Sequence, residues 1–241
     1  MRDDGLMRLL LVRHGQTSSN IGHHLDTAAP GADLTEFGRA QAAAVPGALA
    51  DEDIRAVYAS TLVRTQQTAA PLARELGLEV RVRDGLREIA AGDLEMRNDR
   101  DGIERYVRQV FGWEGDLDER MPGAETGREV LDRFDAVVAE AEQEVGDGGT
   151  VVCFAHGAVI RMWSALRGDN IDLAFASDRP LENTAMVALE GGSDQGWTVA
   201  SWTDTALGGS TLTDTRHTGP GGEPDDDPYE PAPNRPGIVT R

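Results

Sequence analysis

The chain has 241 residues, a formal net charge of −19 and one cysteine. This length suits one α/β domain with a large core, because folding at this size buries about 70–75% of the unfolded surface. The strong negative charge argues against binding to nucleic acid or to an anionic membrane. A single cysteine excludes an intramolecular disulfide framework, and the sequence has neither a long apolar span nor a signal peptide. We therefore expect a cytoplasmic protein.

The most informative stretch is an apolar run that ends in charged residues. Leu9 to Val12 is short and aliphatic, and Arg13-His14-Gly15 follows directly, which predicts a buried strand of a parallel sheet. Ligands of open α/β sheets bind just outside the carboxyl ends of the strands, and glycine lets the backbone turn sharply there. Arg13 and His14 would then form an anion site with a nucleophilic or acid/base imidazole. An ordinary strand with a surface Arg-His pair is the alternative.

The next elements bring another arginine to a comparable position. Thr35 is predicted to cap a helix that ends near Pro46. Ile54–Ala59 is predicted as a second strand, followed by a helix over 62–76. Arg64 falls in the first turn of that helix, where free backbone N–H groups favour an anion. A solvated position on the helix surface is the alternative for Arg64.

A carboxylate follows the third predicted strand, 79–82. Glu88 stands between Leu86 and Ile89 in a loop, and partial desolvation by such neighbours would raise its pKa and suit a general acid.

The segment 95–123 is predicted to form a small cap, with a helix over 104–113. The stretch from Asp99 to Gly102 is interpreted as a helix start, because no apolar strand precedes it as an aspartate nucleophile would require.

A second strand that ends in His-Gly is predicted later in the chain. A helix over 129–145 precedes the predicted strand Thr150–Ala155, and His156-Gly157 follows that strand. Cys153 lies within the strand and is interpreted as a small core residue. A helix over 159–167 completes this unit. The recurrence of His-Gly after an apolar strand carries more weight than either instance alone.

Two further strands, 184–189 and 196–202, are predicted to pair as a hairpin through Gly191-Gly192. The tryptophans are interpreted as packing residues: Trp113, Trp163, Trp197 and Trp202. Residues 6–207 thus form the predicted catalytic domain. The segment 208–241 is rich in Pro, Gly and Asp and lacks apolar periodicity, so we expect a disordered tail.

The alternation of strands and helices predicts an α/β three-layer sandwich, with a mostly parallel central sheet, helices on both faces and the cap over the carboxyl edge. A group of charged residues then follows the strands at that edge: Arg13, His14, Arg64, Glu88 and His156. Such a group suits a phosphoryl ligand, because arginine donates bidentate hydrogen bonds to phosphoryl oxygens and imidazole can attack phosphorus.

These residues belong to a longer ordered set of motifs between Met7 and Leu207. The set comprises Arg13-His14-Gly15, Leu34-Thr35 with Gly38 and Gln41-Ala42, Ser60-x-Leu62-x-Arg64-Thr65 with Thr68-Ala69, Leu86-Arg87-Glu88-Ile89, Glu125-Thr126, and Ala155-His156-Gly157. With these motifs in this order, the chain resembles the histidine phosphatase superfamily, also called phosphoglycerate-mutase-like, and specifically its phosphatase branch.

The resemblance implies a role for each matching residue. His14 would be the nucleophile and carry the phosphoryl group as phosphohistidine. Arg13, Arg64 and His156 would bind the phosphoryl oxygens. Glu88 would protonate the leaving oxygen and later activate water. The resemblance also implies substrate contacts, at Gln16, Thr17, Asn20 and Asn183, and it implies no metal and no cofactor.

The resemblance leaves the substrate and the exact reaction open. Gly92-Asp93 is followed by Leu94-Glu95-Met96, whereas phosphatases of the family often carry Trp-Glu-Gly there. A phosphomonoester hydrolase acting on a small phosphorylated metabolite is the expected function, because the segment 95–123 is short for the lid of a mutase. A cofactor-primed mutase of the phosphoglycerate type and a non-catalytic phospho-ligand binding module are the alternatives. The oligomeric state is also open, a homodimer included.

Overall fold

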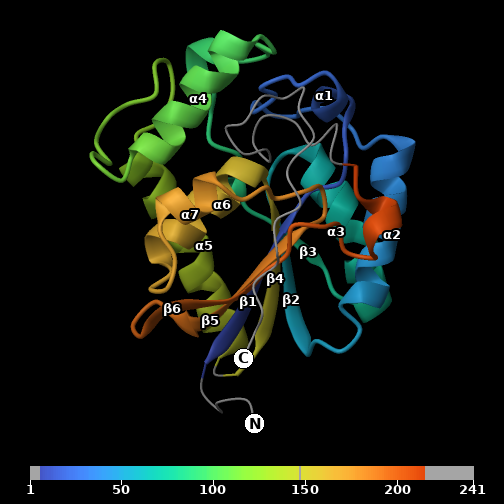
Figure 1. The fold of residues 1–241 in the computed structure, drawn as a ribbon. Coiled ribbons are helices and arrows are strands. Elements are labelled where there is room, and N and C mark those ends of the chain that lie inside the picture. The colour runs from blue at the N-terminus through green and yellow to red at the C-terminus, as the bar shows by residue number, and fades with distance from the viewer. Residues whose placement is uncertain (1–5, 147, 215–241) are drawn as a thin grey trace.

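The computed structural model describes residues 6–146 and 148–214, which form a central sheet covered by helices on both faces (Figure 1). The strands are β1 (Met7–Arg13), β2 (Ile54–Ala59), β3 (Val80–Val82), β4 (Thr150–Ala155), β5 (Met186–Gly192) and β6 (Gly196–Trp202). The helices are α1 (Ser18–Ile21), α2 (Glu36–Ala48), α3 (Val63–Leu76), α4 (Arg100–Gly112), α5 (Gly127–Val145), α6 (Gly157–Arg167) and α7 (Leu173–Ser177). Short 3-10 turns are η1 (Asp84–Leu86), η2 (Gly92–Leu94) and η3 (Ser210–Leu212).

The six strands lie in the order β3-β2-β4-β1-β5-β6. β3, β2, β4 and β1 are parallel, whereas β5 and β6 join antiparallel at one edge. Strands β1 and β4 pair from Arg8 with Thr150 to Arg13 with Ala155, so both strands end at the same level. The predicted α/β class with a mostly parallel sheet is confirmed. Helices α1 and α4 lie beyond the carboxyl ends of the parallel strands (Figure 1).

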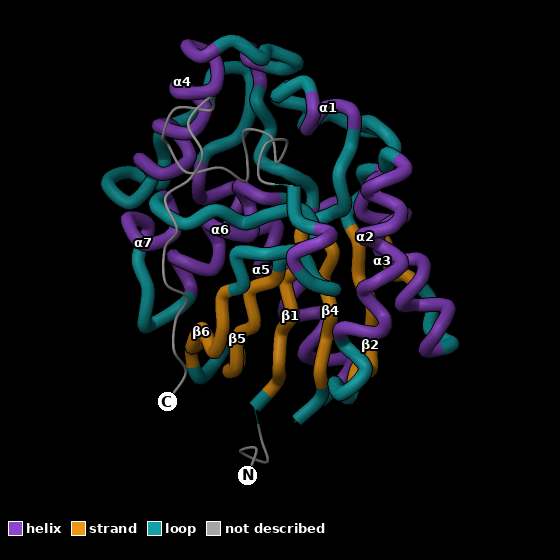
Figure 2. Tube along the Cα trace, turned by 45° about the vertical axis from the view of Figure 1, so that its right-hand side comes forward, coloured by secondary structure: helices purple, strands orange, loops and turns teal. Residues whose placement is uncertain are grey.

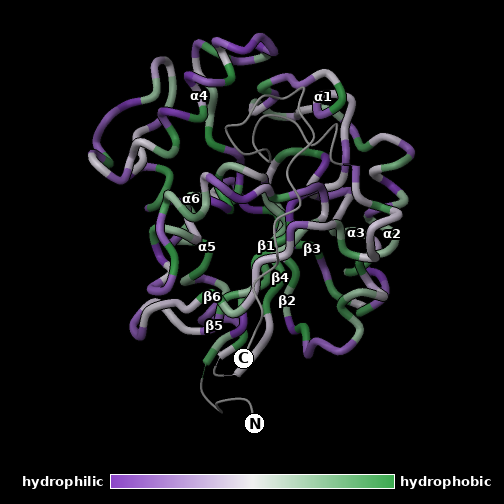
Figure 3. Tube along the Cα trace, viewed as in Figure 1, coloured by the Kyte–Doolittle hydropathy of each residue, from purple (hydrophilic) through white to green (hydrophobic). Residues whose placement is uncertain are grey.

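Alternate residues of each strand point to opposite faces, and this alternation builds a core on each side of the sheet. On one face, Leu9 and Leu11 pack in a cluster with residues of α4, α5, α6 and α7. On the other face, Leu10 and Val12 pack with residues of α2 and α3. Figure 2 shows α2 and α3 on the opposite side of the strands from α5 and α6. The central strands are mainly hydrophobic, and hydrophilic residues gather on the outer turns of α4 (Figure 3).

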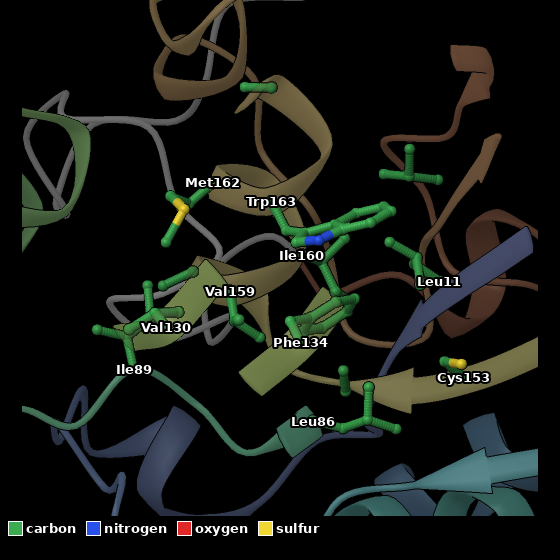
Figure 4. Close-up of a cluster of buried hydrophobic side chains, with 14 of the residues drawn as sticks. Leu11, Leu86, Ile89, Val130, Phe134, Cys153, Val159, Ile160, Met162 and Trp163 are labelled. Atoms are coloured by element: carbon green, nitrogen blue, oxygen red, sulfur yellow. The ribbon is translucent and has the colours of Figure 1, made fainter. Parts of the chain in front are cut away.

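The larger cluster contains the predicted packing residues. Phe134 and Trp163 have ring centroids 5.0 Å apart, and both belong to the same cluster as Leu11 and Cys153 of the strands (Figure 4). Cys153 is buried, and burial raises the pKa of its thiol, as expected for a core residue rather than a nucleophile. All tryptophans are buried: Trp113, Trp163, Trp197 and Trp202.

Most predicted elements are confirmed, and the differences lie at their ends. The helix predicted over 104–113 begins at Arg100, because the side chain of Asp99 accepts the backbone N–H of Gly102 and caps it. The strand predicted from Thr184 begins at Met186, since Thr184 has a φ of 60°. Both glycines at the predicted hairpin turn belong to β5, and the turn follows them at residues 193–195. Helices α1 and α7 were not predicted.

The described chain continues past the predicted domain boundary at 207. Residues 208–214 include η3 and pack against α2, where Gln41 Nε2 donates to the backbone oxygen of Leu212 at 2.8 Å. The described part of the predicted tail thus contacts the domain, and its backbone satisfies a buried amide there. The rest of the predicted tail, 215–241, lies outside the described residues. Within residues 6–146 and 148–214, no helix is long and apolar enough to cross a membrane.

Candidate active site

The carboxyl end of β1 places Arg13 and His14 above the sheet. The backbone N–H of His14 donates to Ala155 of the neighbouring β4 at 3.1 Å, so the ladder holds the histidine at the strand end. Gly15 then turns the chain away. A Cβ on Gly15 would lie 2.6 Å from the backbone oxygen of Gly38, so only glycine lets the start of α2 pack so closely against this turn.

The ring of His14 is held in one tautomer. Its Nδ1 lies 2.8 Å from the backbone oxygen of Gly15, and a carbonyl oxygen can only accept, so Nδ1 carries the proton. The lone pair of the neutral ring is therefore on Nε2. Burial, and then the positive charges of Arg64 and Arg13, hold the pKa of His14 well below its usual value. The neutral, nucleophilic form is the stable one at neutral pH.

His156 lies beside His14 at the end of β4, with the ring centroids 5.2 Å apart. Its Nε2 is 2.8 Å from the hydroxyl of Ser60, which is 2.9 Å from the hydroxyl of Thr65. Thr65 donates to the backbone oxygen of Leu62 at 2.8 Å. The hydroxyl of Ser60 therefore donates its hydrogen bond to Thr65 and accepts a hydrogen bond from Nε2–H of His156. Within the described chain, Nδ1 of His156 is buried without a hydrogen-bond partner.

Arg64 extends from the first turn of α3 toward the same place and is buried. Its Nη2 donates to the backbone oxygen of Asp26 at 2.8 Å, and its Nη1 lies 3.7 Å from the Asp26 carboxylate. Among the described residues, Nε and Nη1 of Arg64 have no hydrogen-bond partner. Gly31, with a φ of 70°, leaves room for this guanidinium, because a Cβ there would overlap Nη1. A buried guanidinium with unused donors is suited to an anion.

Glu88 provides the carboxylate. Its Oε1 accepts the backbone N–H of Ile89 and of Val159, both at 2.9 Å, and its Oε2 accepts that of Ala158 at 3.1 Å. Ala158 and Val159 belong to the first turn of α6, whose free N–H groups are thereby satisfied. Burial raises the pKa of Glu88 above its usual value, while these N–H groups and Arg64 lower it to a smaller extent. The carboxyl group is thus shifted toward its protonated form.

Of the predicted catalytic residues, Arg13, His14, Arg64 and Glu88 line a small cavity of about 30 Å³, whereas His156 lies beside His14 and is not part of the lining. The residues that line it are Arg13, His14, Asn20, His24, Leu25, Asp26, Thr27, Arg64, Glu88 and Tyr106. Such a volume holds about two water molecules, so it fits a small anion rather than a whole large ligand. The cavity brings a neutral imidazole, guanidinium groups and a carboxyl group together.

The remaining predicted site residues lie around this cavity rather than in its lining. Thr17 caps α1, and its backbone N–H and hydroxyl both donate to Asn20 Oδ1, so it orients a residue that lines the cavity. Asn183 Nδ2 donates to the backbone oxygen of His14 at 3.0 Å. Gln16 turns toward the end of the described chain, where its Nε2 donates to Asp214 at 2.9 Å. In the structure the Gln16 side chain thus contacts the segment after β6, and its substrate contact stays a prediction.

Several lining residues were not predicted. Tyr106 of α4 is buried and donates its hydroxyl to the backbone oxygen of Ile89, next to Glu88, at 2.9 Å. Thr27 is held by the carboxylate of Glu95, which also accepts the backbone N–H of Ala28 at 3.0 Å. The helical pattern around Tyr106 could not show which face of α4 meets the cavity, and the loop of Thr27 carries no periodic signal.

The chain matches the family model of the histidine phosphatase superfamily (branch 1) over residues 9–205. A PE-PGRS family protein of Mycobacterium tuberculosis is 34% identical over 219 residues, which are 83% of this chain and 37% of that protein. The chain thus spans little more than a third of that relative's length. The probable phosphoglycerate mutase GpmB of Salmonella choleraesuis is 29% identical over 160 residues, 64% of this chain and 72% of that protein.

A solved structure shares the fold. The mycobacterial glucosyl-3-phosphoglycerate phosphatase, solved as a complex with VO3, has a TM-score of 0.70 and 28% identity. The match covers 82% of this chain and 99% of that one. Phosphatases and mutases are thus both found among the proteins that the chain is similar to. The family match covers most of the sequence and includes every strand end that carries the site, so the chain belongs to the histidine phosphatase superfamily.

Proposed function

We propose that the protein is a metal-independent phosphomonoester hydrolase that acts through a phosphohistidine on His14. One observation carries the proposal: Nδ1 of His14 donates to Gly15, which leaves the lone pair of Nε2 available in a cavity that Arg64 and Glu88 also line. A neutral imidazole is a competent nucleophile toward phosphorus, and guanidinium groups neutralise the oxygens of the phosphoryl group.

In the first step, His14 Nε2 attacks phosphorus and the bond between phosphorus and the ester oxygen breaks. Protonated Glu88 donates its proton to that oxygen, so the product leaves as a neutral alcohol. Arg13 and Arg64 stabilise the charge on the phosphoryl oxygens. His156 contributes when its Nδ1 gains a proton and donates a hydrogen bond to the same group.

In the second step, water attacks the phosphohistidine and the bond between nitrogen and phosphorus breaks. The Glu88 carboxylate takes a proton from the water, and His14 returns to its neutral form. Inorganic phosphate is released, and Glu88 is again protonated for the next cycle.

Hydrolysis is preferred over phosphoryl transfer between two positions of a substrate. The mycobacterial phosphatase matches 82% of this chain at 28% identity, whereas the mutase relative matches 64% of it at 29% identity. The substrate class we propose is a small phosphorylated metabolite whose phosphoryl group enters the cavity while the rest stays outside, because the cavity measures about 30 Å³.

The test is phosphate release from a panel of monoesters, including 3-phosphoglycerate and p-nitrophenyl phosphate, with wild type, His14→Ala and His23→Ala. His23 is adjacent to His24 but does not line the cavity, so it controls for loss of an imidazole near the site. Of the two variants, only His14→Ala should lose both phosphate release and the alkali-stable phosphoenzyme. Interconversion of phosphoglycerate isomers after priming with a bisphosphate, without release, would make the protein a mutase. Activity that survives His14→Ala would refute the nucleophile.

A further inference from the structure

An arginine outside the cavity divides its hydrogen-bond donors between the loop that carries Glu88 and the carboxylate of Glu125. Arg133 lies on α5, and its Nε and Nη2 donate to the two carboxylate oxygens of Glu125 at 2.8 and 3.1 Å. Its Nη1 donates to the backbone oxygens of Gly85 and Arg87 at 2.7 and 2.8 Å, and Nη2 also donates to that of Glu88 at 3.2 Å. A guanidinium has five N–H donors, and these contacts occupy each of them.

Arg133 and Glu125 together form a clamp around the loop that carries Glu88, and Glu125 adds contacts of its own. Besides Arg133, its carboxylate accepts Arg87 Nη2 at 2.6 Å and the backbone N–H of Ala90 at 3.4 Å. The side chains of Arg133 and Glu125 are only 12% and 11% exposed, so solvent screens the pair weakly. The loop is thus bound through the oxygens of Gly85, Arg87 and Glu88 on one side and the N–H of Ala90 on the other.

The clamp and the start of α6 hold Glu88 at different points. The α6 amides fix the carboxylate, while Arg133 fixes the backbone oxygen of the same residue. A proton donor must lie within hydrogen-bond reach of its acceptor, and a displacement of about 1 Å from the reactive geometry can reduce a rate about 100-fold. α5 also approaches the loop closely, because a Cβ on Gly85 would overlap the backbone oxygen of Arg133.

We propose that Arg133, oriented by Glu125, is a positioning residue for the general acid Glu88. This inference rests on the proposed function, in which Glu88 protonates the leaving oxygen. Arg133 does not line the cavity and is not placed among the groups that bind the phosphoryl oxygens. Its hydrogen bonds go to the loop of Glu88 and to Glu125, so we expect the loss of those bonds to act on the step in which Glu88 takes part.

The experiment compares phosphate esters whose leaving groups differ in how much they need protonation by a general acid. An alkyl phosphate such as 3-phosphoglycerate releases an alkoxide oxygen that must be protonated, whereas p-nitrophenolate leaves as a stable anion. We expect Arg133→Lys, with three donors in place of five, to lower kcat/KM for the alkyl ester about 10- to 100-fold and for p-nitrophenyl phosphate less than about 3-fold. Glu125→Gln keeps the shape of the clamp and should show the same selectivity in milder form.

Arg83→Lys is the matched control. Arg83 donates to both carboxylate oxygens of Glu140, also on α5, at 2.7 and 2.6 Å, and its side chain also donates to the backbone oxygen of Val82, outside the loop of Glu88. Kinetics with both esters should be unchanged in this variant. In a Glu88→Gln background, Arg133→Lys should add no further loss on the alkyl ester, because it acts through Glu88.

Thermal unfolding and vanadate inhibition are measured for every variant, to distinguish a misfolded protein from a folded protein in which Glu88 is displaced. Equal losses on both esters, or no loss on either, would overturn the positioning role while hydrolysis by the wild type stands. A wild type that hydrolyses neither ester and forms no phosphohistidine would instead overturn the proposed function, and the role of Arg133 with it.

Discussion

Replacing Ser60 with alanine removes the hydrogen-bond acceptor of a buried histidine of the site. Ser60 accepts the Nε2 proton of His156 at 2.8 Å, while Nδ1 of the same ring has no hydrogen-bond partner among the described residues. Burial, followed by nearby positive charges, that of Arg64 first, holds the pKa of His156 well below its usual value. In the proposed mechanism, a bound dianion would offset those positive charges, and the imidazolium would form when the phosphoryl group is in place.

The magnitude follows from the type of hydrogen bond. In the imidazolium the bond to Ser60 is charge-assisted, and a hydrogen bond to a charged group contributes about 1.5–3 kcal/mol. Loss of that amount from the transition state corresponds to a decrease in kcat/KM of about 10- to 150-fold. We expect Ser60→Ala to show this decrease, with a parallel loss of affinity for vanadate, because both ligands need the Nδ1 proton.

The assay is steady-state phosphate release with p-nitrophenyl phosphate, supported by vanadate inhibition. Ser164→Ala is the control: Ser164 is also buried, on α6, and its hydroxyl has no hydrogen-bond partner in the described part of the chain. That variant should match the wild type. A Ser60→Ala enzyme whose kcat/KM stays within about twofold of the wild type would refute the role given to this hydrogen bond.

Two further predictions concern Arg64 and the buried histidines. Gly31→Ala should weaken inhibition by phosphate and lower kcat/KM, because Gly31 has a φ of 70° and the new Cβ would overlap Arg64 Nη1. Gly47→Ala is the control, because Gly47 lies in α2 with no atom near the position of its Cβ. This variant should leave activity intact and stabilise the fold by up to about 1 kcal/mol. The pKa of His14 in the folded protein lies below the usual 6.5, so the unfolded chain takes up a proton at a higher pH than the folded protein does. The free energy of unfolding should therefore fall as the pH drops from about 6.5 toward the pKa of His14 in the folded protein. Denaturant midpoints measured from about pH 7.5 to 5 should fall less steeply in His14→Asn, and identical slopes would contradict the lowered pKa.

Elements whose signals are local were predictable from the sequence. Thr35 and Asp99 stand at helix starts because each side chain accepts a backbone N–H three residues on, a contact that involves only near neighbours. The strands Ile54–Ala59 and Thr150–Ala155 have the predicted bounds, because runs of apolar residues mark buried strands directly. α1 and α7 were missed, since helices as short as these depend on tertiary packing rather than on their own propensity.

The site residues also fall into those that the sequence could predict and those that depended on the tertiary structure. Arg13, His14, Arg64 and Glu88 could be predicted as one group, because residues at the carboxyl ends of parallel strands share an edge of the sheet. The sequence could not show that Gln16 turns away toward Asp214, nor which face of α4 brings Tyr106 to the cavity. Those placements depend on the packing of elements far apart in the chain.

By itself, the sequence determined the class of fold, the ends of its strands and the charged residues placed there, because periodicity, caps and the chemistry of side chains are local properties. Only the tertiary structure decided the tautomer of His14 and the hydrogen bonds around Glu88. Each depends on a carbonyl or amide whose position is set by a neighbouring strand, turn or helix. Arg133 illustrates the reason, since three of its hydrogen bonds go to backbone oxygens between Gly85 and Glu88, which lie 45 or more residues away in sequence.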